Sequence, residues 1–371
     1  MTAGPDPEIT FAVHPATRPV SDSERARLLA APGFGDIFTD HMVTLRYSPE
    51  HGWHDGRLEP YGPLSLDPAT AVFHYGQEIF EGLKAYRQPA GPIVLFRPWA
   101  NAARFRRSAT RMAMPELPEE AFVHAVELLV SQDRDWVPTT PDHSLYVRPF
   151  MIATHRGLGV SAPSSTYLFT VIASPAASYF SGGIRSVRVW LADGYSRAAP
   201  GGTGAAKTGG NYAASFAGQS QAIEHGCDQV VWLDAVEGRW VEEMGGMNMY
   251  FVYGSGDRAR IVTPALTGSL LPGITRDALL SLAPTLGIPA AEGAVSAPEW
   301  RAGCGSGEIT EAFACGTAAV ITPVGEVDSV SGGWTIGDGS PGPVTMRLRE
   351  ALLGLQFGQQ PDPHAWVHKV C

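Results

Sequence analysis

The sequence is short of positive charge and of cysteine. Lysine and arginine together number 27 against 37 aspartate and glutamate residues, which leaves a formal net charge of −10. Nucleic-acid-binding proteins carry a basic excess, so this balance argues against a nucleic-acid partner, although small anionic ligands can still meet local clusters of arginine. The four cysteines have no CxxC spacing and are too few for a disulfide framework in 371 residues. We therefore expect reduced thiols and a cytoplasmic location.

Long hydrophobic runs are missing as well. The N-terminus, MTAGPDPEIT, lacks the basic stretch and the apolar run of a signal peptide. The longest segment without Asp, Glu, Lys or Arg, from Gly157 to Ile184, is interrupted by proline, serine and glycine. This composition is typical of a strand and a linker, and it predicts that the protein does not cross a membrane.

What the sequence does contain is enough apolar material for two folded cores. Hydrophobic residues make up 44% of the chain and charged residues 17%, which is a globular composition. At roughly 150 residues per domain, the length predicts two domains. There is no internal repeat and no low-complexity tract.

Hydrophobic periodicity predicts a mixture of helices and strands. Apolar residues recur at helical spacing over 102–112 and 122–130, and again over 212–225, 275–286 and 344–355. Runs rich in β-branched and aromatic residues predict strands at 92–96, 144–150, 166–173, 187–191, 229–233, 247–253 and 260–263. The Ser-, Pro-, Gly- and Ala-rich segment at 174–183 is typical of a connector. We expect an α+β protein with a smaller N-terminal α/β domain (1–174), a linker (175–186) and a larger C-terminal domain (187–371).

A single lysine, Lys207, lies in the glycine-rich stretch GGTGAAKTGGNY. A phosphate-binding P-loop needs glycine where Ala206 stands, and it needs the lysine to open a helix directly, so the nucleotide interpretation is weak. A solvated lysine in a surface loop is the plainer alternative. In an apolar or cationic setting, however, a lysine becomes a nucleophilic amine that can form a Schiff base with an aldehyde such as pyridoxal phosphate.

Such a site also needs a carboxylate for the ring nitrogen and a phenol near the ring oxygen. Glu242 and Glu243 are adjacent, so on a strand their side chains point to opposite faces and only one can face the site. An ordinary edge-strand or turn pair is the alternative for these two residues. Tyr212 follows Lys207 by five residues, and it can equally be a helix-start aromatic residue packed on the core.

A phosphate also needs cationic or N–H donors. Arg104, Arg107 and Arg111 share one helical stripe, which is either a solvated face or a stripe with one inward-facing member. The sequence LPGITR places Thr275 at a helix start, as a donor or as a simple N-cap. The sequence CGTAA, at 315–319, is typical of a second tight turn.

Tyr146 and Arg148 alternate with Val147, so both point to one face of a predicted strand. A guanidinium there requires an anionic partner, which is either a ligand or a structural carboxylate. His51 and His54 have only Asp55 nearby, and we expect a surface turn rather than a metal site.

Taken together, several motifs in order closely resemble the branched-chain amino acid aminotransferases, which are fold-type IV enzymes that use pyridoxal phosphate. The resemblance extends from about residue 38 to the C-terminal helix. The motifs are YGQEIFEGLKAYR (75–87), NAARFRRSA (101–109), LYVRPF (145–150), GGTGAAKTGGNYA (201–213), GCDQVVWLD (226–234), EMGGMN (243–248) and LLPGITR (270–276).

The resemblance implies a role for each matching position. Lys207 would form the Schiff base, Glu243 would meet the ring nitrogen, and Tyr212 would lie by the ring oxygen. The phosphate would be bound by Arg104, Ile274, Thr275 and Thr317. The substrate pocket would contain Phe34, Tyr75, Phe80, Tyr146, Tyr179 and Gly246, with Ala318 and Ala319 beside Thr317 for the α-carboxylate. Arg148 would bind the side-chain carboxylate of glutamate or 2-oxoglutarate.

The resemblance implies transamination of Leu, Ile and Val with 2-oxoglutarate by a homodimer that shares its active sites. Two alternatives share the fold: a D-amino acid aminotransferase and an aminodeoxychorismate lyase. A non-catalytic phosphate-binding protein is the alternative from another class. This sequence also departs from some relatives, because Ala319 and Thr322 occupy the positions of a redox-active CxxC and Gly246 replaces a threonine. We therefore expect no thiol switch at that turn.

Overall fold

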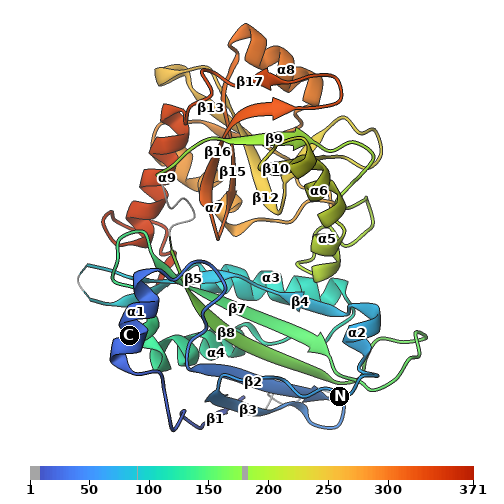
Figure 1. Cartoon of the computed structure of the whole chain (residues 1–371), viewed down its shortest axis with the longest axis vertical. Coiled ribbons are helices and arrows are strands. Elements are labelled where there is room, and N and C mark those ends of the chain that lie inside the picture. The colour runs from blue at the N-terminus through green and yellow to red at the C-terminus, as the bar shows by residue number, and fades with distance from the viewer. Residues whose placement is uncertain (1–8, 90, 178–182) are drawn as a thin grey trace. The chain divides into compact units, whose positions relative to one another are not determined.

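The protein, seen here as a computed structural model, is described over residues 9–89, 91–177 and 183–371 (Figure 1). It divides into two compact units. The N-terminal unit contains Met1–Ala177 together with Pro363–Cys371, and the C-terminal unit contains Ser178–Asp362. Tyr179, a predicted substrate-pocket residue, lies outside the described residues.

The N-terminal unit is built on one mostly antiparallel sheet with the strand order β1-β3-β2-β8-β7-β5-β6-β18, in which β4 also pairs with β7. Its strands are β1 (Phe11–Val13), β2 (His41–Ser48), β3 (Gly52–Pro60), β4 (Glu78–Phe80), β5 (Leu83–Arg87), β6 (Ile93–Phe96), β7 (Ser144–Ala153), β8 (Tyr167–Ala176) and β18 (Val367–Lys369). Its helices are α1 (Asp22–Ala30), α2 (Ala71–Tyr75), α3 (Pro98–Arg111) and α4 (Glu119–Gln132), with a 3-10 turn at Arg134–Trp136.

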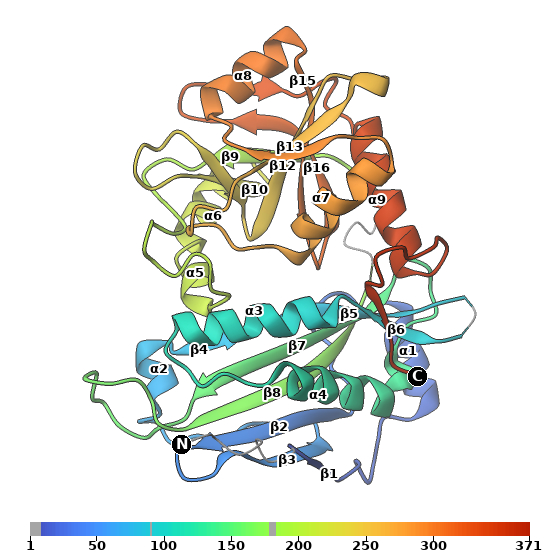
Figure 2. The ribbon, with the colours of Figure 1, turned by 180° about the vertical axis from the view of Figure 1, so that it is seen from behind.

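Two of these helices, α3 and α4, cover one face of the sheet (Figure 2). Their predicted apolar stripes are the buried ones. The ring centroids of Phe105 of α3 and Phe122 of α4 are 5.2 Å apart, and they lie 5.5 and 6.0 Å from that of Phe169 of β8. The three predicted strands of this half are confirmed as β6, β7 and β8.

The end of β8 corrects the predicted linker. Pro175 and Ala176, expected to open the connector, continue the strand and pair with Leu145 and Ser144 of β7. Small residues are compatible with a strand here because the partner strand is equally long and pairs along its whole length.

The C-terminal unit has a second sheet with the order β11-β10-β9-β16-β15-β12-β13-β14. β11 also pairs with β12, so the strands from β11 to β12 along this path form a closed ring. The strands are β9 (Val187–Leu191), β10 (Gln229–Leu233), β11 (Val241–Met244), β12 (Met247–Tyr253), β13 (Arg260–Pro264), β14 (Ala290–Gly293), β15 (Ile309–Gly316), β16 (Val320–Asp328) and β17 (Trp334–Thr335). The helices are α5 (Gly209–Ala213), α6 (Phe216–Glu224), α7 (Ile274–Thr285), α8 (Ala297–Ser306) and α9 (Pro343–Gln356), with a 3-10 turn at Gly256–Arg258.

The helix expected over 212–225 is two helices, α5 and α6. The Ser215 side chain donates to the Tyr212 carbonyl at 2.6 Å, and this local bond occupies an acceptor at the point where the helix is interrupted. Gly226 follows α6 with a φ of +69°, which is the left-handed conformation expected of a glycine after a helix.

The last nine residues correct the predicted domain limits. β18 pairs with β6 through Val367–Phe96 and Lys369–Val94, so Pro363–Cys371 belong to the N-terminal unit rather than to a C-terminal domain ending at residue 371. With this addition the two units have nearly equal length and do not show the expected difference in size.

The environment of the cysteines leads to a prediction about thiol reactivity. Burial raises the pKa of the Cys304 thiol to about 11 and raises the pKa of Cys315 well above its usual range. Burial also raises the pKa of Cys227, whereas Cys371 is exposed. Because the thiolate is the reactive form, a disulfide reagent at pH 8 should label Cys371 quickly and the other three cysteines only after denaturation.

Peptide mapping of the labelled native protein measures this. Fast labelling of Cys315, which precedes the turn at 317–319, would contradict the expectation that this turn carries no thiol switch.

Candidate active site

Lys207 lies in the loop before α5 and is half-buried. Its Nζ donates to the Tyr212 hydroxyl at 2.7 Å and lies 5.2 Å from the centre of that ring. Gly209 and Gly210, expected to separate the lysine from a helix, are the first residues of α5. This short helix therefore brings Tyr212 back to the lysine, and the two predicted residues form one pair.

Gly246 lies against the same tyrosine. A Cβ placed on Gly246 would come within 3.1 Å of Tyr212 Cε1, which is tighter than ordinary van der Waals contact. The hairpin between β11 and β12 thus packs directly on the Tyr212 ring, and the glycine permits this close approach.

Glu243 is a buried acid of this unit, with 2% of its surface exposed, and the charge of Lys207 acts on it. One of its oxygens accepts from the Leu271 backbone N–H at 2.7 Å and from Asn248 Nδ2 at 3.4 Å. The other is 2.9 Å from Arg197 Nε. Burial raises the pKa of Glu243, while the Arg197 charge, the Leu271 hydrogen bond and the nearby Lys207 ammonium oppose that rise. The carboxylate and the Lys207 amine are therefore close enough to influence each other's charge.

Glu242 has a separate set of partners. It is 7% exposed and accepts a hydrogen bond from Ser269 Oγ. Among the described residues, none of the groups that donate to Glu243 also donates to Glu242. It lines a cavity of about 420 Å³ whose walls include Trp240, Val241 and Leu270. The alternation of β11 therefore separates the two glutamates, as the sequence predicts, and Glu243 is the one beside Lys207.

Neighbouring strands connect Glu243 to the turn that is predicted to bind the phosphate and the α-carboxylate. Glu243 pairs with Asn248 on β12, and Asn248 pairs with Cys315 on β15. The turn of Thr317, Ala318 and Ala319 follows β15 and leads into β16, which confirms the tight turn expected at CGTAA.

The start of α7 lies against Asn248, the β12 residue that pairs with Glu243. A Cβ on Gly273, the N-cap residue of α7, would come within 2.0 Å of Asn248 Oδ1, so a larger residue here would require the Asn248 side chain to move. Ile274 and buried Thr275 form the first turn of the helix, and the Thr275 side chain does not cap it. The N-terminus of a twelve-residue helix directs N–H groups toward an anion.

Arg197, Asn248 and Leu271 are functional residues that the sequence analysis missed. Arg197 is buried and belongs to SRAAPGGTGAAK, where it is the sole charged residue between Asp193 and Lys207. A lone charge in a long uncharged segment was the available signal. The other two contacts involve an amide side chain and a backbone N–H, for which the sequence carries no comparable signal.

In the N-terminal unit, Arg104 is the inward member of the arginine stripe. It is 4% exposed, whereas Arg107 and Arg111 are exposed. Its Nε and Nη2 donate to the two carboxylate oxygens of Glu81 at 2.7 and 2.9 Å, and Asn101 Nδ2 also donates to Glu81. The structure thus places a fixed, buried cation on α3.

Arg148 lies among aromatic rings. Its guanidinium is 4.8 Å from the centre of the Phe80 ring and 5.3 Å from that of Tyr146, whose hydroxyl accepts from Nη2 at 3.2 Å. Phe34 meets Tyr146 edge-on with centroids 5.2 Å apart. Arg148 Nε is buried without a hydrogen-bond partner, and no described carboxylate forms an ion pair with this arginine. The structural salt bridge considered from the sequence is therefore not seen among the described residues.

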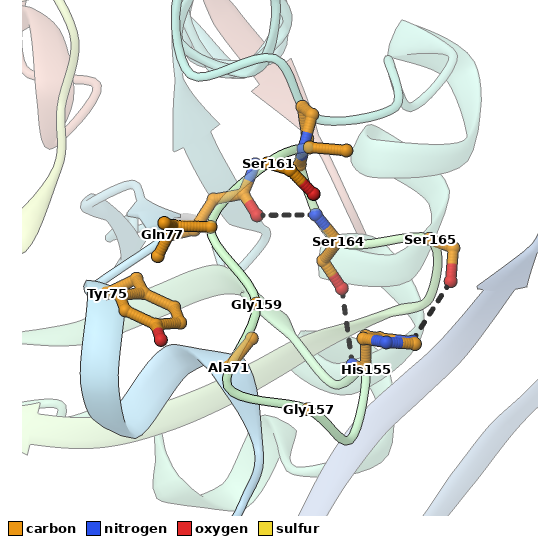
Figure 3. A pocket seen from close by; sticks show the side chains of 12 residues that line it. Ala71, Tyr75, Gln77, His155, Gly157, Gly159, Ser161, Ser164 and Ser165 are labelled. Atoms are coloured by element: carbon orange, nitrogen blue, oxygen red, sulfur yellow. Dashed lines mark hydrogen bonds between the residues drawn. The ribbon is translucent and has the colours of Figure 1, made fainter.

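Tyr75 lies at a pocket of about 590 Å³ (Figure 3). Its hydroxyl donates to the Leu158 carbonyl at 2.5 Å. Across the pocket, the Ser164 N–H donates to Gln77 Oε1 at 3.1 Å. Neither Phe80 nor Arg148 is among the described residues that line this pocket, so it does not bring Tyr75 together with the other predicted substrate residues.

The described residues lack two other kinds of feature. No group of three or more His, Cys, Asp or Glu side chains is arranged to hold a metal ion there. Nor does that part of the chain contain a helix with the length and apolar character needed to span a bilayer.

Comparisons with known proteins identify the family of the chain. Residues 78–327 match the family described as Amino-transferase class IV. The branched-chain-amino-acid aminotransferase of Mycolicibacterium smegmatis is 57% identical over 371 residues, covering 100% of both chains. A protein of Streptomyces coelicolor named as a probable branched-chain-amino-acid aminotransferase is also 57% identical, over 97% of this chain and 99% of its own.

Solved structures show the same fold. The branched-chain amino acid aminotransferase of Escherichia coli superimposes with a TM-score of 0.73 at 28% identity, covering 90% of this chain and 99% of that one. The branched-chain aminotransferase of Thermoproteus uzoniensis, solved with norvaline, gives a TM-score of 0.72 at 26% identity over 89% and 100% of the two chains. The fold is therefore that of the fold-type IV aminotransferases, and the chain belongs to the class IV aminotransferase family as one of its branched-chain-amino-acid aminotransferases.

Proposed function

We propose that the chain transfers the amino group of leucine, isoleucine or valine to 2-oxoglutarate, with pyridoxal 5'-phosphate as cofactor and Lys207 as the catalytic residue. The observation that carries the proposal is the pairing of a half-buried lysine with Tyr212 beside the buried, ion-paired Glu243. A relative named as a branched-chain-amino-acid aminotransferase, 57% identical over the whole chain, supports the same activity.

The C-terminal unit fits this cofactor. When bound, pyridoxal phosphate supplies an aldehyde for the amino group and a ring that accepts electrons from the substrate. Glu243 would hold the ring nitrogen, and the Tyr212 hydroxyl would lie by the ring oxygen. The phosphate would meet Ile274 and Thr275 at the start of α7, together with Thr317. The family resemblance assigns Arg104 to the phosphate as well. A buried carboxylate with three donors and an uncapped helix start of this kind suit a cationic ring nitrogen and an anionic phosphate.

The scarcity of lysine supports the role of Lys207. The chain has three lysines, Lys84, Lys207 and Lys369. Lys84 is buried on β5 and Lys369 is exposed on β18, both in the N-terminal unit. Lys207 has a phenol as its hydrogen-bond partner, and its charge acts on a buried carboxylate.

Each of these residues has a definite task. The Lys207 amine would take the α-proton of the substrate and later give it back, as a general base and then a general acid. The Tyr212 hydroxyl accepts the Lys207 N–H and so fixes the direction of the amine. The partners of Glu243 would hold its carboxylate in a fixed orientation toward the ring nitrogen.

The N-terminal unit supplies the features for substrate recognition. Phe34, Phe80 and Tyr146 form an aromatic surface for an aliphatic side chain, while Arg148 lies over two of these rings without a described carboxylate partner. We expect this arginine to pair with the side-chain carboxylate of glutamate or 2-oxoglutarate, and the rings to pack on leucine, isoleucine or valine. The family resemblance also assigns Tyr75, Gly246 and the turn of Thr317–Ala319 to the substrate, and these residues are proposed contacts on that ground alone.

The setting of the enzyme is part of the same proposal. Reduced thiols and the acidic net charge favour a cytoplasmic enzyme without a nucleic-acid or membrane partner, and the family resemblance favours a homodimer. Light scattering on a size-exclusion column should give the mass of two chains.

A panel of amino donors tests the activity. Leucine, isoleucine, valine and D-alanine are compared with 2-oxoglutarate as acceptor, and one of the three branched L-amino acids should have the highest kcat/KM. D-Alanine as the best donor would instead support a D-amino acid aminotransferase. Absence of transfer from all four, with pyridoxal phosphate present, would support a lyase or a phosphate-binding protein.

Replacing Lys207 tests the catalytic residue. Lys207→Ala removes the amine that joins the cofactor and moves the proton, so the visible absorbance of the bound cofactor should disappear and turnover should fall by about a thousandfold or more. Lys369→Ala, in the other unit, is the matched control and should retain both. Normal turnover of Lys207→Ala would refute the assignment.

Replacing Arg148 tests the recognition of the second substrate. Arg148→Met keeps the apolar stem and removes the charge, so KM for 2-oxoglutarate should rise by about tenfold or more, while KM for leucine should change little. Exposed Arg107→Met is the control. Equal increases in both KM values would show that Arg148 supports the pocket as a whole rather than the carboxylate.

A further inference from the structure

Arg197 is a buried arginine that contacts none of the predicted cofactor groups except Glu243. Its Nε is 2.9 Å from Glu243 Oε2, and the two side chains are 6% and 2% exposed. Its Nη2 donates to the backbone carbonyls of Gly204 and Ser269, at 3.3 and 3.2 Å. One guanidinium therefore joins an acid on β11 to two separate loops.

The charge of Arg197 offsets the cost of burying two adjacent carboxyl groups. Glu242 and Glu243 are neighbours, and both are buried. Burial raises the pKa of each carboxyl group, and Arg197 opposes the rise at both. Removing one partner of a buried ion pair leaves the other charge uncompensated, and a carboxylate in that position takes up a proton instead.

The carbonyl contacts of Arg197 fix the segment that carries the lysine. A Cβ on Gly204 would come within 2.1 Å of the Ser269 carbonyl oxygen, so these two loops are in direct backbone contact. Arg197 binds both at that junction. Lys207 follows Gly204 by three residues, so the arginine connects the lysine loop to the loop that donates the Leu271 N–H to Glu243.

We infer that Arg197 is a positioning residue, which holds the Glu243 carboxylate as an oriented anion for the cofactor ring nitrogen and anchors the Lys207 segment to that same carboxylate. The inference rests on the cofactor site proposed above. A purely structural ion pair would affect the binding of every cofactor analogue equally. A residue that orients Glu243 for the ring nitrogen affects only the binding of molecules that have this nitrogen.

That difference can be measured without turnover. The probes are pyridoxal 5'-phosphate and its 1-deaza analogue, in which carbon replaces the ring nitrogen. Dissociation constants for both are determined by equilibrium dialysis on the wild type and on Arg197→Met, Glu243→Gln and Arg185→Met. Arg185 is an exposed arginine paired with Asp228 and serves as the matched control. Circular dichroism and thermal unfolding establish that each variant is folded.

We expect wild type and Arg185→Met to prefer pyridoxal phosphate over the deaza analogue by about tenfold or more, since a charge-assisted hydrogen bond contributes a factor of this size. In Arg197→Met and Glu243→Gln the preference should fall to within about threefold of unity. Arg197→Lys, which retains the charge, should restore most of it. If Arg197→Met does not fold, Arg197→Gln removes the charge while keeping N–H donors, and the same loss is expected.

Three outcomes separate the inference from the site on which it rests. A wild-type preference in Glu243→Gln would contradict the cofactor site itself. Loss of the preference in Glu243→Gln but not in the charge-free Arg197 variants would overturn the positioning role. An equal loss of affinity for both probes in Arg197→Met, with the preference unchanged, would likewise show that this arginine is merely structural.

Discussion

The proposed cofactor site of the C-terminal unit depends on keeping one buried carboxylate charged. Glu243 is almost fully removed from water, and an isolated carboxylate in that position would be protonated. The fold supplies three compensating donors from three places: the Arg197 guanidinium, the Leu271 backbone N–H and the Asn248 amide. The glycines at 204 and 273 lie at the close contacts that this arrangement requires.

The two units contribute different chemistry. Within the C-terminal unit, an amine, a phenol, a carboxylate and a helix N-terminus are gathered around β11, β12 and the start of α7. Within the N-terminal unit, Arg104 is held rigidly by Glu81, while Arg148 lies on aromatic rings with a buried Nε that has no partner. The two arginines thus differ in their partners. Arg104 is paired with the carboxylate of Glu81, whereas Arg148 has no carboxylate partner among the described residues.

Local sequence patterns predicted the helices and strands that bury apolar residues at a regular spacing. They did not predict pairing between strands that lie far apart in the sequence. Helices α3 and α4 and strands β6 to β8 follow from periodicity, and the alternation of β11 separated Glu242 from Glu243. The attachment of β18 to β6 was missed because a three-residue strand has no periodic signal.

The same limit applies to the residues of the site. Lys207 was recognisable from its glycines. Arg197 stands out as a lone charge, but its position in the sequence does not reveal its partners, one of which is a carbonyl 72 residues away. Tyr75 was predicted from the family motif, and its position relative to Arg148 was not accessible to spacing alone.

The central claim, that Lys207 is the amine joined to the cofactor, can be tested by borohydride reduction. Reduction of the loaded protein fixes the cofactor to the amine that holds it, and peptide mass spectrometry then locates the label. With three lysines in the chain, the outcome is unambiguous. We predict one label, on the peptide that contains Lys207. A label on Lys84 or Lys369 instead, or no label on a protein that binds the cofactor, would contradict the claim.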